Sequence, residues 1–198
     1  VTEQPAPTGA VKDDTTAPTQ PVSTISFNPK PLQGKDMWGV SILDQLACRI
    51  EFHLLDYKGR YTPPSERGSI IYPGNFGPFN WGAVAVDPQR QVMFAMPVYL
   101  AFTSKLVKRP NDTARVVSKD GEDIFNENFG APWASKMGPF ISPIKLPCQQ
   151  PPWGYVAGVD LTTGKIVYRH VNGTVRDLSP ILLPFKMGVP GIGGPIVT

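Results

Sequence analysis

Trp81-Gly82-Ala83-Val84-Ala85-Val86-Asp87 is the stretch that decides the fold, because it returns 72 positions later as Trp153-Gly154-Tyr155-Val156-Ala157-Gly158-Val159-Asp160. A few turn-forming residues and then a short apolar run follow each copy, at 92–95 and at 166–168. Strand, tight turn and strand in this order predict a β-hairpin. A recurring hairpin is typical of β-propellers and other repeated β structures. Because the spacing exceeds one blade, we expect the two copies to lie in different blades, separated by a long insertion.

The composition agrees with a β-rich globular chain. Among 198 residues there are 23 prolines and 19 glycines, which is too many for a compact helical protein, and 41% of residues are hydrophobic, which excludes general disorder. A net charge of +3, carried by scattered residues, does not indicate a nucleic-acid partner. The sequence contains no apolar run of about 18 residues, so we do not expect this chain to span a membrane.

The chain divides into an extended connector at residues 1–35 and a partial β-propeller region at residues 36–198. The connector is rich in proline, threonine and glutamine and lacks apolar periodicity. Within the second region, a long insertion at about 109–150 has few apolar pairs and is too long for an ordinary connection, so we expect a functional or docking loop there.

Several local elements can be placed by pattern. A short helix is expected within 38–57, giving way to a strand near 50–54. Further strands are expected at 69–72 and 99–108, and the proline-punctuated tail should enter a final strand near Gly194. The expected fold class is all-β.

The two cysteines, Cys48 and Cys148, cannot make a four-ligand metal site by themselves. They are either two buried thiols or one disulfide that closes a loop of about 100 residues. Composition alone leaves both possibilities open.

No complete catalytic signature occurs in the sequence. The best candidate for a ligand site is the segment 72–82, in which Asn75 and Asn80 flank glycines and Trp81 adds aromatic surface. Amide groups and close backbone approach suit a flat ligand. The alternative is a turn between strands that the asparagine side chains stabilise. Asp87 and Asp160 each open a turn and are expected to accept hydrogen bonds from turn amides.

At these residues the chain closely resembles a known family, the membrane-bound, pyrroloquinoline quinone (PQQ)-dependent dehydrogenases that act on glucose, quinate and shikimate. The matching phrases run in order over almost the whole chain: Met37-Trp38-Gly39, Asp44-Gln45-Leu46, Cys48-Arg49, Tyr61-Thr62-Pro63-Pro64-Ser65-Glu66, Tyr72-Pro73-Gly74-Asn75, Trp81-Gly82, Ser104-Lys105-Leu106, Phe140-Ile141-Ser142-Pro143, Leu146-Pro147-Cys148, Trp153-Gly154-Tyr155 and Gly193-Gly194-Pro195. The segment 109–135 matches least well.

The resemblance implies that the chain is an internal piece, about two blades with long loops, of an eight-bladed β-propeller. Its start at Val1 and its end within strand-like sequence agree with a piece of a longer polypeptide. The parent would be a periplasmic domain of a bacterial inner-membrane protein, held by N-terminal membrane helices. Residues 157–168 resemble the tryptophan-docking motif that ends each blade, with Tyr168 in place of the tryptophan.

The resemblance also implies roles for single residues. Asn75 matches the asparagine that the family associates with the quinone, and Asn80 stands, beside Trp81, where related alcohol dehydrogenases carry a cofactor-facing asparagine. Asn80 also stands where glucose-type members commonly carry an acidic residue. No catalytic residue and no metal ligand is assigned in this chain, because the family's catalytic base lies upstream. The periplasmic setting favours a disulfide between Cys48 and Cys148.

The expected function is part of a dehydrogenase that oxidises D-glucose to gluconolactone with PQQ and passes electrons to ubiquinone. The alternatives are a quinate, shikimate or other polyol dehydrogenase, and a non-catalytic β-propeller for binding or scaffolding. The parent would hold PQQ with Ca²⁺ or Mg²⁺, whereas these 198 residues are expected to bind the quinone weakly or not at all. Exposed sheet edges are expected to favour self-association of the isolated chain.

Overall fold

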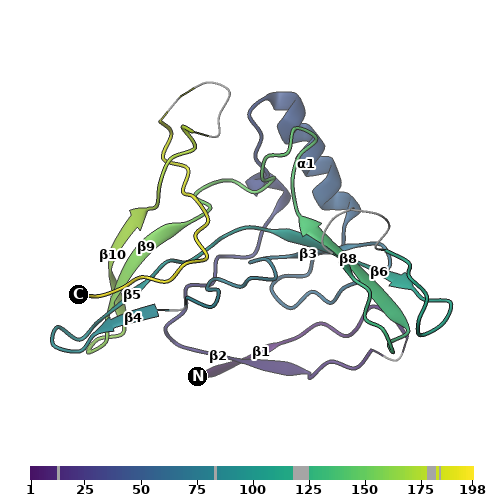
Figure 1. The fold of residues 1–198 in the computed structure, drawn as a ribbon, viewed down its shortest axis with the longest axis horizontal. Helices are drawn as coiled ribbons and strands as arrows, with labels where there is room; N and C mark the ends of the chain where they lie inside the picture. The colour runs from purple at the N-terminus through teal and green to yellow at the C-terminus, as the bar shows by residue number, and fades with distance from the viewer. Residues whose placement is uncertain (13, 83, 118–124, 178–181, 183) are drawn as a thin grey trace. The chain divides into compact units, whose positions relative to one another are not determined.

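The structure is a computed structural model that describes residues 1–12, 14–82, 84–117, 125–177, 182 and 184–198 (Figure 1). The chain forms two compact units. Unit 1 contains Val1–Ser23, Pro31–Tyr72 and Ala101–Gln149, and unit 2 contains Thr24–Lys30, Pro73–Leu100 and Gln150–Thr198. Antiparallel strands dominate both units, which confirms the expected all-β class.

The described elements are, in chain order, β1 (Thr2–Pro5), β2 (Thr19–Val22), the short 3-10 helix η1 (Gly34–Asp36), α1 (Ile42–Leu54), β3 (Ser69–Ile71), β4 (Val84–Asp87), β5 (Val92–Ala95), β6 (Phe102–Lys108), β7 (Phe125–Asn126), β8 (Trp133–Pro139), β9 (Tyr155–Asp160) and β10 (Lys165–Val171).

The two repeated hairpins lie side by side in unit 2, as Figure 1 shows. They form one four-stranded sheet in the order β10-β9-β5-β4, in which β5 pairs antiparallel with β9. The expectation that the copies lie in different blades is therefore wrong. The reason is that the inner strands carry small or branched side chains that are buried, Ala95, Ala157 and Val159, so each hairpin completes the other's core. The long separation in sequence is an insertion within one sheet.

Both hairpin turns of unit 2 lie at the same end of this sheet. The register aligns Asp87 with Val92 and Val92 with Asp160, and the backbone N–H of Leu161 donates to Gln91 O at 2.8 Å. Gln91 and Gly164 have the positive φ values, 54° and 67°, that close the two turns. The repeated phrase thus produces two matching turns joined by a backbone hydrogen bond.

The glycine-rich tail runs against the repeated Trp-Gly phrases. A Cβ atom on Gly154 would lie 2.5 Å from Val189 O, and one on Gly82 would lie 2.1 Å from Gly194 N. Both glycines are therefore required by close backbone approach. The tail forms no strand in residues 184–198, so the expected strand near Gly194 is not present. The physical reason is the spacing of its prolines and glycines, which interrupt any continuous ladder.

Unit 1 contains a second four-stranded sheet, in the order β3-β6-β8-β7. Its longest pairing runs between β6 and β8, from Phe102 opposite Pro139 to Lys108 opposite Trp133. The segment that the sequence suggested as a long insertion, 109–150, thus supplies β7 and β8. Pattern alone misses β8 because its sequence, WASKMGP, has no regular alternation of apolar and polar residues.

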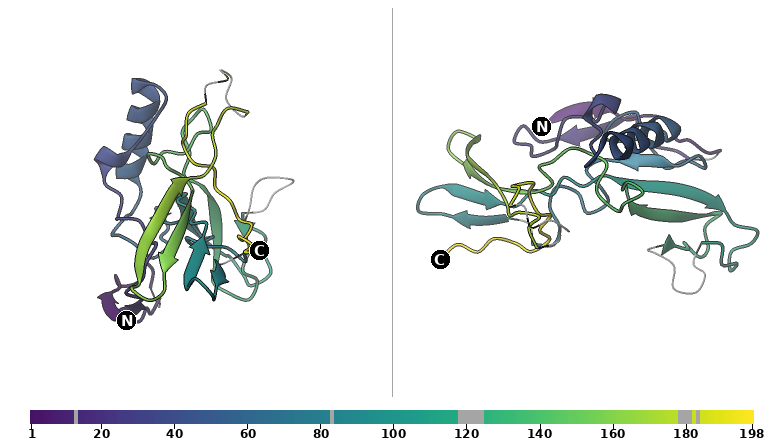
Figure 2. Two further views of the ribbon diagram at one scale, coloured as in Figure 1. Left: turned by 90° about the vertical axis from the view of Figure 1, so that its left-hand side faces the viewer. Right: turned by 90° about the horizontal axis from the view of Figure 1, so that it is seen from above.

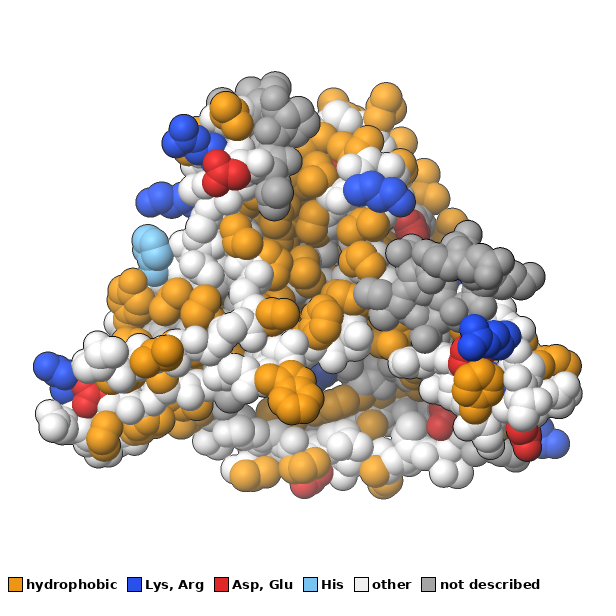
Figure 3. Space-filling view, viewed as in Figure 1, with side chains coloured by type: hydrophobic (Ala, Val, Ile, Leu, Met, Phe, Trp, Pro, Cys, Tyr) orange, Lys and Arg blue, Asp and Glu red, His pale blue; other side chains and the backbone are white. Residues whose placement is uncertain are grey.

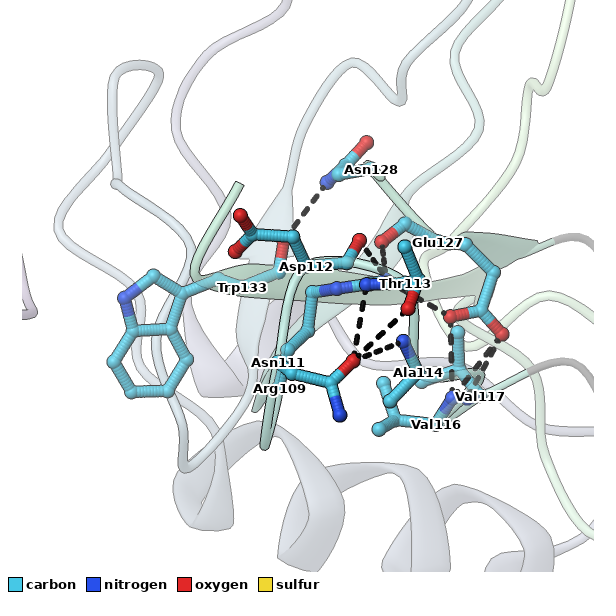
Figure 4. Close-up of polar contacts among 10 residues, drawn as sticks. All are labelled: Arg109, Asn111, Asp112, Thr113, Ala114, Val116, Val117, Glu127, Asn128 and Trp133. Carbon is cyan, nitrogen blue, oxygen red and sulfur yellow. Dashed lines mark hydrogen bonds and ion pairs between the residues drawn. The ribbon is translucent and has the colours of Figure 1, made fainter. Parts of the chain in front are cut away.

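A buried ion pair organises the loop that links β6 to β7 (Figure 4). The Arg109 guanidinium lies 3.2 Å from the Glu127 carboxylate and also donates to Glu127 O and Asp112 O. The same carboxylate accepts hydrogen bonds from two successive backbone amides, those of Val116 and Val117. One side-chain pair therefore joins the described first part of this loop, from Arg109 to Val117, to Glu127 after β7.

Helix α1 begins where Ser41 accepts a hydrogen bond from Asp44 N at 3.2 Å and ends at Leu54. The expected strand near 50–54 is wrong, since these residues continue the helix. Arg67 explains the difference, because its guanidinium donates to the carbonyl oxygens of His53 and Leu54 and so satisfies groups that a helix end leaves open.

The structure contains a disulfide between Cys48 and Cys148 within unit 1. Both residues are fully buried, and the bond ties the inner face of α1 to the segment after β8. Backbone contacts reinforce this junction, since Trp38 N donates to Cys148 O at 2.7 Å and Cys148 N donates to Phe140 O at 3.0 Å.

The first residues of the chain contain more structure than an extended connector. Strands β1 and β2 pair antiparallel, with Thr2 opposite Val22 and Pro5 opposite Thr19. This ribbon is almost fully exposed, with burial only at Val22, so its strands carry no apolar alternation that a sequence pattern could reveal.

Candidate functional site

The candidate site is the loop of unit 2 that contains Asn75, Asn80 and Trp81. It starts with a tight turn in which Gly77 N donates to Gly74 O at 2.7 Å, while Gly74 N donates to Leu100 O at 2.6 Å. Gly77 has φ 66°, which a glycine adopts without strain. Asn75 occupies the tip of this turn and is exposed. No hydrogen bond joins its side chain to another residue in the described part of the chain.

The middle of the loop is anchored to the core of unit 2. Val98 N donates to Pro78 O at 2.8 Å, and the Phe79 ring packs edge-on against the buried Phe27 ring with centroids 5.3 Å apart. Phe27 O in turn accepts a hydrogen bond from the buried Tyr99 hydroxyl. This support holds the middle of the loop in place, between the exposed Asn75 and the exposed Trp81.

Phe27 is a supporting residue that sequence reasoning missed. It lies in the segment that was expected to be an extended connector. The available signal was a single large aromatic residue within an otherwise polar, proline-containing stretch. Such a residue is usually buried against another element.

Of the three predicted site residues, Asn80 and Trp81, which are adjacent in the sequence, are joined by a hydrogen bond. The Asn80 carboxamide oxygen accepts a hydrogen bond from Trp81 N at 2.8 Å, so this side chain is used in the loop itself. The Trp81 side chain is 98% exposed. An indole with no cover is unusual, because its large apolar face is normally buried against a partner.

The loop therefore offers an unpaired carboxamide at Asn75 and a bare aromatic face at Trp81. A carboxamide can both donate and accept hydrogen bonds, and an indole face can stack on a flat conjugated ring. Such a pair suits a planar molecule with carbonyl or carboxylate groups. The turn-stabilising alternative describes Asn80 better than Asn75, since only Asn80 bonds the loop backbone.

The turn aspartates have structural roles. Asp87 accepts hydrogen bonds from Gln89 N and Arg90 N and pairs with the Arg90 guanidinium at 2.7 Å, and the side-chain hydrogen bond from Arg90 is the main cause that lowers its pKa. A side-chain hydrogen bond from Thr162 is the main cause that lowers the pKa of Asp160. Both carboxylates are held ionised in a fixed geometry, which does not suit proton exchange in catalysis.

Within the described ranges, no three or more histidine, cysteine, aspartate or glutamate side chains gather closely enough to hold a metal ion. Cys48 and Cys148 are used in the disulfide.

Comparison with known proteins supplies the family. Residues 1–198 match the family described as PQQ: Glucose/ethanol/alcohol dehydrogenase, beta-propeller domain. The chain belongs to the PQQ-dependent dehydrogenase β-propeller family. The resemblance drawn from the sequence phrases and the propeller fold expected from them are thereby confirmed.

Three curated proteins show how similar this PQQ-dependent propeller chain is in sequence to its relatives. It is 49% identical over 99% of its length to a quinoprotein glucose dehydrogenase of Gluconobacter oxydans (strain 621H) and 45% identical over 99% to one of Escherichia coli (strain K12). It is 34% identical over its whole length to a probable quinate dehydrogenase (quinone) of Xanthomonas campestris pv. juglandis. In each case it spans about a quarter of the relative, 26%.

For a piece of a PQQ-dependent propeller, unit 2 has the expected strand number, since propeller blades are four-stranded sheets. The docking-motif segment 157–168 falls on β9, its turn and the start of β10, with Tyr168 about half exposed. None of the helices in the described ranges has the length and apolar character needed to cross a bilayer.

Proposed function

We propose that the protein is part of the periplasmic catalytic domain of a quinoprotein that oxidises D-glucose to gluconolactone and passes the electrons to ubiquinone. The observation that carries this proposal is the higher identity to two quinoprotein glucose dehydrogenases than to a quinate dehydrogenase, over nearly the whole chain in each case. The setting we propose is the periplasmic side of a bacterial inner membrane.

The residues of this chain that would hold PQQ are Asn75, Asn80 and Trp81. The exposed indole of Trp81 offers a stacking face, and the free Asn75 carboxamide can donate to a quinone or carboxylate oxygen. Asn80 positions Trp81 through the hydrogen bond to its backbone N–H. PQQ, when bound, supplies the acceptor for the hydride that leaves the alcohol carbon. The loop between residues 73 and 82 contains no lysine or arginine, so charge neutralisation of the cofactor must come from other parts of the parent.

The fit of these residues is testable by cofactor affinity. In the complete protein, Trp81→Ala is expected to weaken PQQ binding about tenfold, because loss of one aromatic stacking partner costs about 1.4 kcal/mol. Phe185→Ala, at an exposed aromatic side chain in the tail, should leave the affinity unchanged. The measurement is a fluorescence or calorimetric titration with PQQ in the presence of Ca²⁺ or Mg²⁺. Equal PQQ affinities for the two variants would show that Trp81 is not part of the cofactor site.

The substrate is tested separately. The complete protein, loaded with PQQ and the metal ion, should reduce an artificial electron acceptor faster with D-glucose than with quinate, shikimate or glycerol, and the product should be gluconolactone. Preference for quinate or shikimate would replace the glucose assignment by the alternative within the family. No oxidation of any of these alcohols by the loaded protein would favour a non-catalytic propeller.

The alternative within the family has its own support. The match to a probable quinate dehydrogenase covers the entire chain. The resemblance also implies that glucose-type members commonly carry an acidic residue where this chain has the neutral Asn80. We therefore retain quinate, shikimate or another polyol as the second candidate substrate.

A further inference from the structure

Two tyrosines of unit 2 form a buried hydroxyl pair. Tyr99 follows β5 and Tyr155 begins β9, and both residues are buried. Their hydroxyl groups are hydrogen-bonded to each other, and their rings pack edge-on with centroids 5.2 Å apart. A buried hydroxyl without a partner would lose its hydrogen bonds to water and gain none in return. The pair is therefore a part of the core of unit 2 that tolerates little change.

The direction of the two hydrogen bonds of Tyr99 follows from their acceptors. Phe27 O is a backbone carbonyl and can only accept, so the Tyr99 hydroxyl donates its single proton to Phe27 O. The Tyr99 oxygen then accepts from the Tyr155 hydroxyl. The order Tyr155 to Tyr99 to Phe27 joins three segments that lie far apart in the sequence.

One end of this series of contacts is fixed on the sheet of unit 2. Tyr99 N donates to Trp153 O at 2.9 Å, which ties Tyr99 to the residues just before β9. The Arg169 guanidinium carbon on β10 lies 3.9 Å from the centroid of the Tyr155 ring, which is within cation–π range. Figure 2 shows β9 and β10 next to each other, in agreement with their antiparallel pairing. The Tyr155 ring is thus held by its own strand and by the neighbouring one.

The other end reaches the candidate quinone loop, residues 73–82. The buried Phe27 ring packs edge-on against the Phe79 ring with centroids 5.3 Å apart. Phe79 stands between Asn75 and Trp81 in the sequence. A shift of Phe27 would therefore move the ring against which the middle of the loop rests.

These contacts lie inside the chain and not on its surface. The chain spans 26% of its relatives, so exposed groups, such as the hydrophobic side chains over the sheet of unit 2 in Figure 3, do not mark a free surface. Tyr99, Tyr155 and Phe27 are all buried and all belong to unit 2. Their hydrogen bonds are therefore made regardless of what packs on the outside of the unit.

We propose that Tyr99 and Tyr155 are positioning residues for the candidate quinone loop. Their hydroxyl pair holds Phe27. Phe27 in turn holds Phe79, which sets the position of Trp81. This role requires no contact between either tyrosine and the cofactor, and it rests on the proposed placement of PQQ at this loop.

The first test measures the loop without cofactor. In the complete, disulfide-bonded protein, Tyr155→Phe should speed hydrogen exchange of the Val98 amide, which donates to Pro78 O, about fivefold, the equivalent of one net hydrogen bond. Tyr57→Phe in unit 1 is the matched control, because it also removes a hydroxyl that bonds the backbone, at Leu32 N. It should leave Val98 exchange unchanged. Exchange measured by mass spectrometry that is the same in Tyr155→Phe and the unmodified protein would overturn the proposal.

The second test is a double-mutant cycle on PQQ affinity. Tyr155→Phe should weaken PQQ binding about fivefold, as expected for one net hydrogen bond. The same change made in Trp81→Ala should weaken it less than about twofold, because the tyrosine acts through the position of Trp81. A general loss of stability would lower the affinity equally in both backgrounds, and that result would overturn the positioning role. Tyr57→Phe should leave the affinity unchanged.

A further variant keeps the tests independent of the hydroxyl groups. Phe79→Leu breaks the ring contact with Phe27 without touching either tyrosine, and it should reproduce the faster Val98 exchange and the weaker PQQ binding. Faster exchange with unchanged PQQ affinity in all variants, Trp81→Ala included, would support the anchoring of the loop and overturn the proposed cofactor site. Unchanged exchange together with weaker PQQ binding by Trp81→Ala would support the cofactor site and overturn the present inference.

Discussion

The two tryptophans of the repeated phrase have opposite environments. Trp153 is 5% exposed, and its backbone N–H donates to Met187 O while its carbonyl accepts from Tyr99 N. Trp81 is 98% exposed, although the residues after it follow the same pattern. The difference arises from which segment lies against each tryptophan. The same Trp-Gly pair therefore supplies one structural tryptophan and one candidate ligand-binding tryptophan.

The glycine after Trp81 gives a prediction at this scale. Gly82→Ala would place a Cβ atom 2.1 Å from Gly194 N, so either the tail or the loop must move. We expect a loss of about 1–3 kcal/mol in the free energy of unfolding, together with weaker PQQ binding because Trp81 is displaced. Gly193→Ala is the matched control, since nothing lies within 4 Å of its Cβ position. Urea unfolding of the two variants measures the difference, and equal stabilities would refute the close approach.

The carboxylate of Asp87 predicts that the free energy of unfolding depends on pH in the acid range. Hydrogen bonds from the Arg90 side chain, then from the Arg90 and Gln89 backbone, lower the pKa of Asp87 in the folded state. Its contribution to stability is thus complete above the unfolded-state pKa of about 4 and is lost as the pH falls through the lowered folded value. Asp87→Asn should therefore flatten the decline of urea stability below about pH 4.

The control for Asp87 is Glu3→Gln on the exposed strand β1, which should leave the acid limb of the stability profile unchanged. A profile for Asp87→Asn that falls as steeply as the unmodified protein would contradict the assigned hydrogen bonds.

At the scale of elements, the pairing of β5 with β9 shows what local patterns leave open. Each hairpin could be predicted by itself, since turn residues and alternation lie within about a dozen positions. Their association could not, because the contact between Met93 and Val159 joins residues far apart in the sequence. Helix α1 is a second case. Its apolar period is present, but its aliphatic face points outward because the disulfide at Cys48 holds the opposite face of the helix inward.

The buried Arg109–Glu127 ion pair predicts a large loss of stability when the Glu127 carboxylate is replaced by an amide. Glu127→Gln would leave a fully buried guanidinium without its counter-charge, and breaking a buried pair costs about 3–5 kcal/mol. The loop of Figure 4 should also lose order, because Val116 and Val117 lose their shared acceptor. Arg90→Gln, at a pair whose arginine side chain is 78% exposed, should have a much smaller effect. Thermal unfolding of the two variants checks this order, and a reversed order would exclude the pair as the loop's main support.

At the scale of the whole molecule, the chain comprises two units, and the disulfide belongs to only one of them. Units 1 and 2 each have a four-stranded antiparallel sheet, but Cys48 and Cys148 both lie in unit 1. The disulfide and the candidate quinone loop are therefore in different units. This division allows each to be perturbed separately.

The disulfide gives the prediction for the whole molecule. Cys48→Ala with Cys148→Ala removes a cross-link across 100 residues, which costs about 4–5 kcal/mol by the loop-entropy estimate. Amide hydrogen exchange should rise most in α1, β6 and β8, and least in β5 and β9. Reduction of the unmodified protein with dithiothreitol should reproduce this pattern. Equal acceleration in both units would show that they unfold together.

The sequence by itself determined the all-β class, the two hairpins, the candidate loop at Asn75 to Trp81 and the family, because turns, strand alternation and matching phrases are local properties of the chain. Only the tertiary structure decided that both hairpins share one sheet, that β1, β2 and β8 exist, that Trp81 is bare while Trp153 is buried, and that α1 turns its aliphatic side chains outward. These features depend on contacts between distant residues. Such contacts are selected by the free energy of the assembled core and the disulfide, which no short stretch of sequence contains.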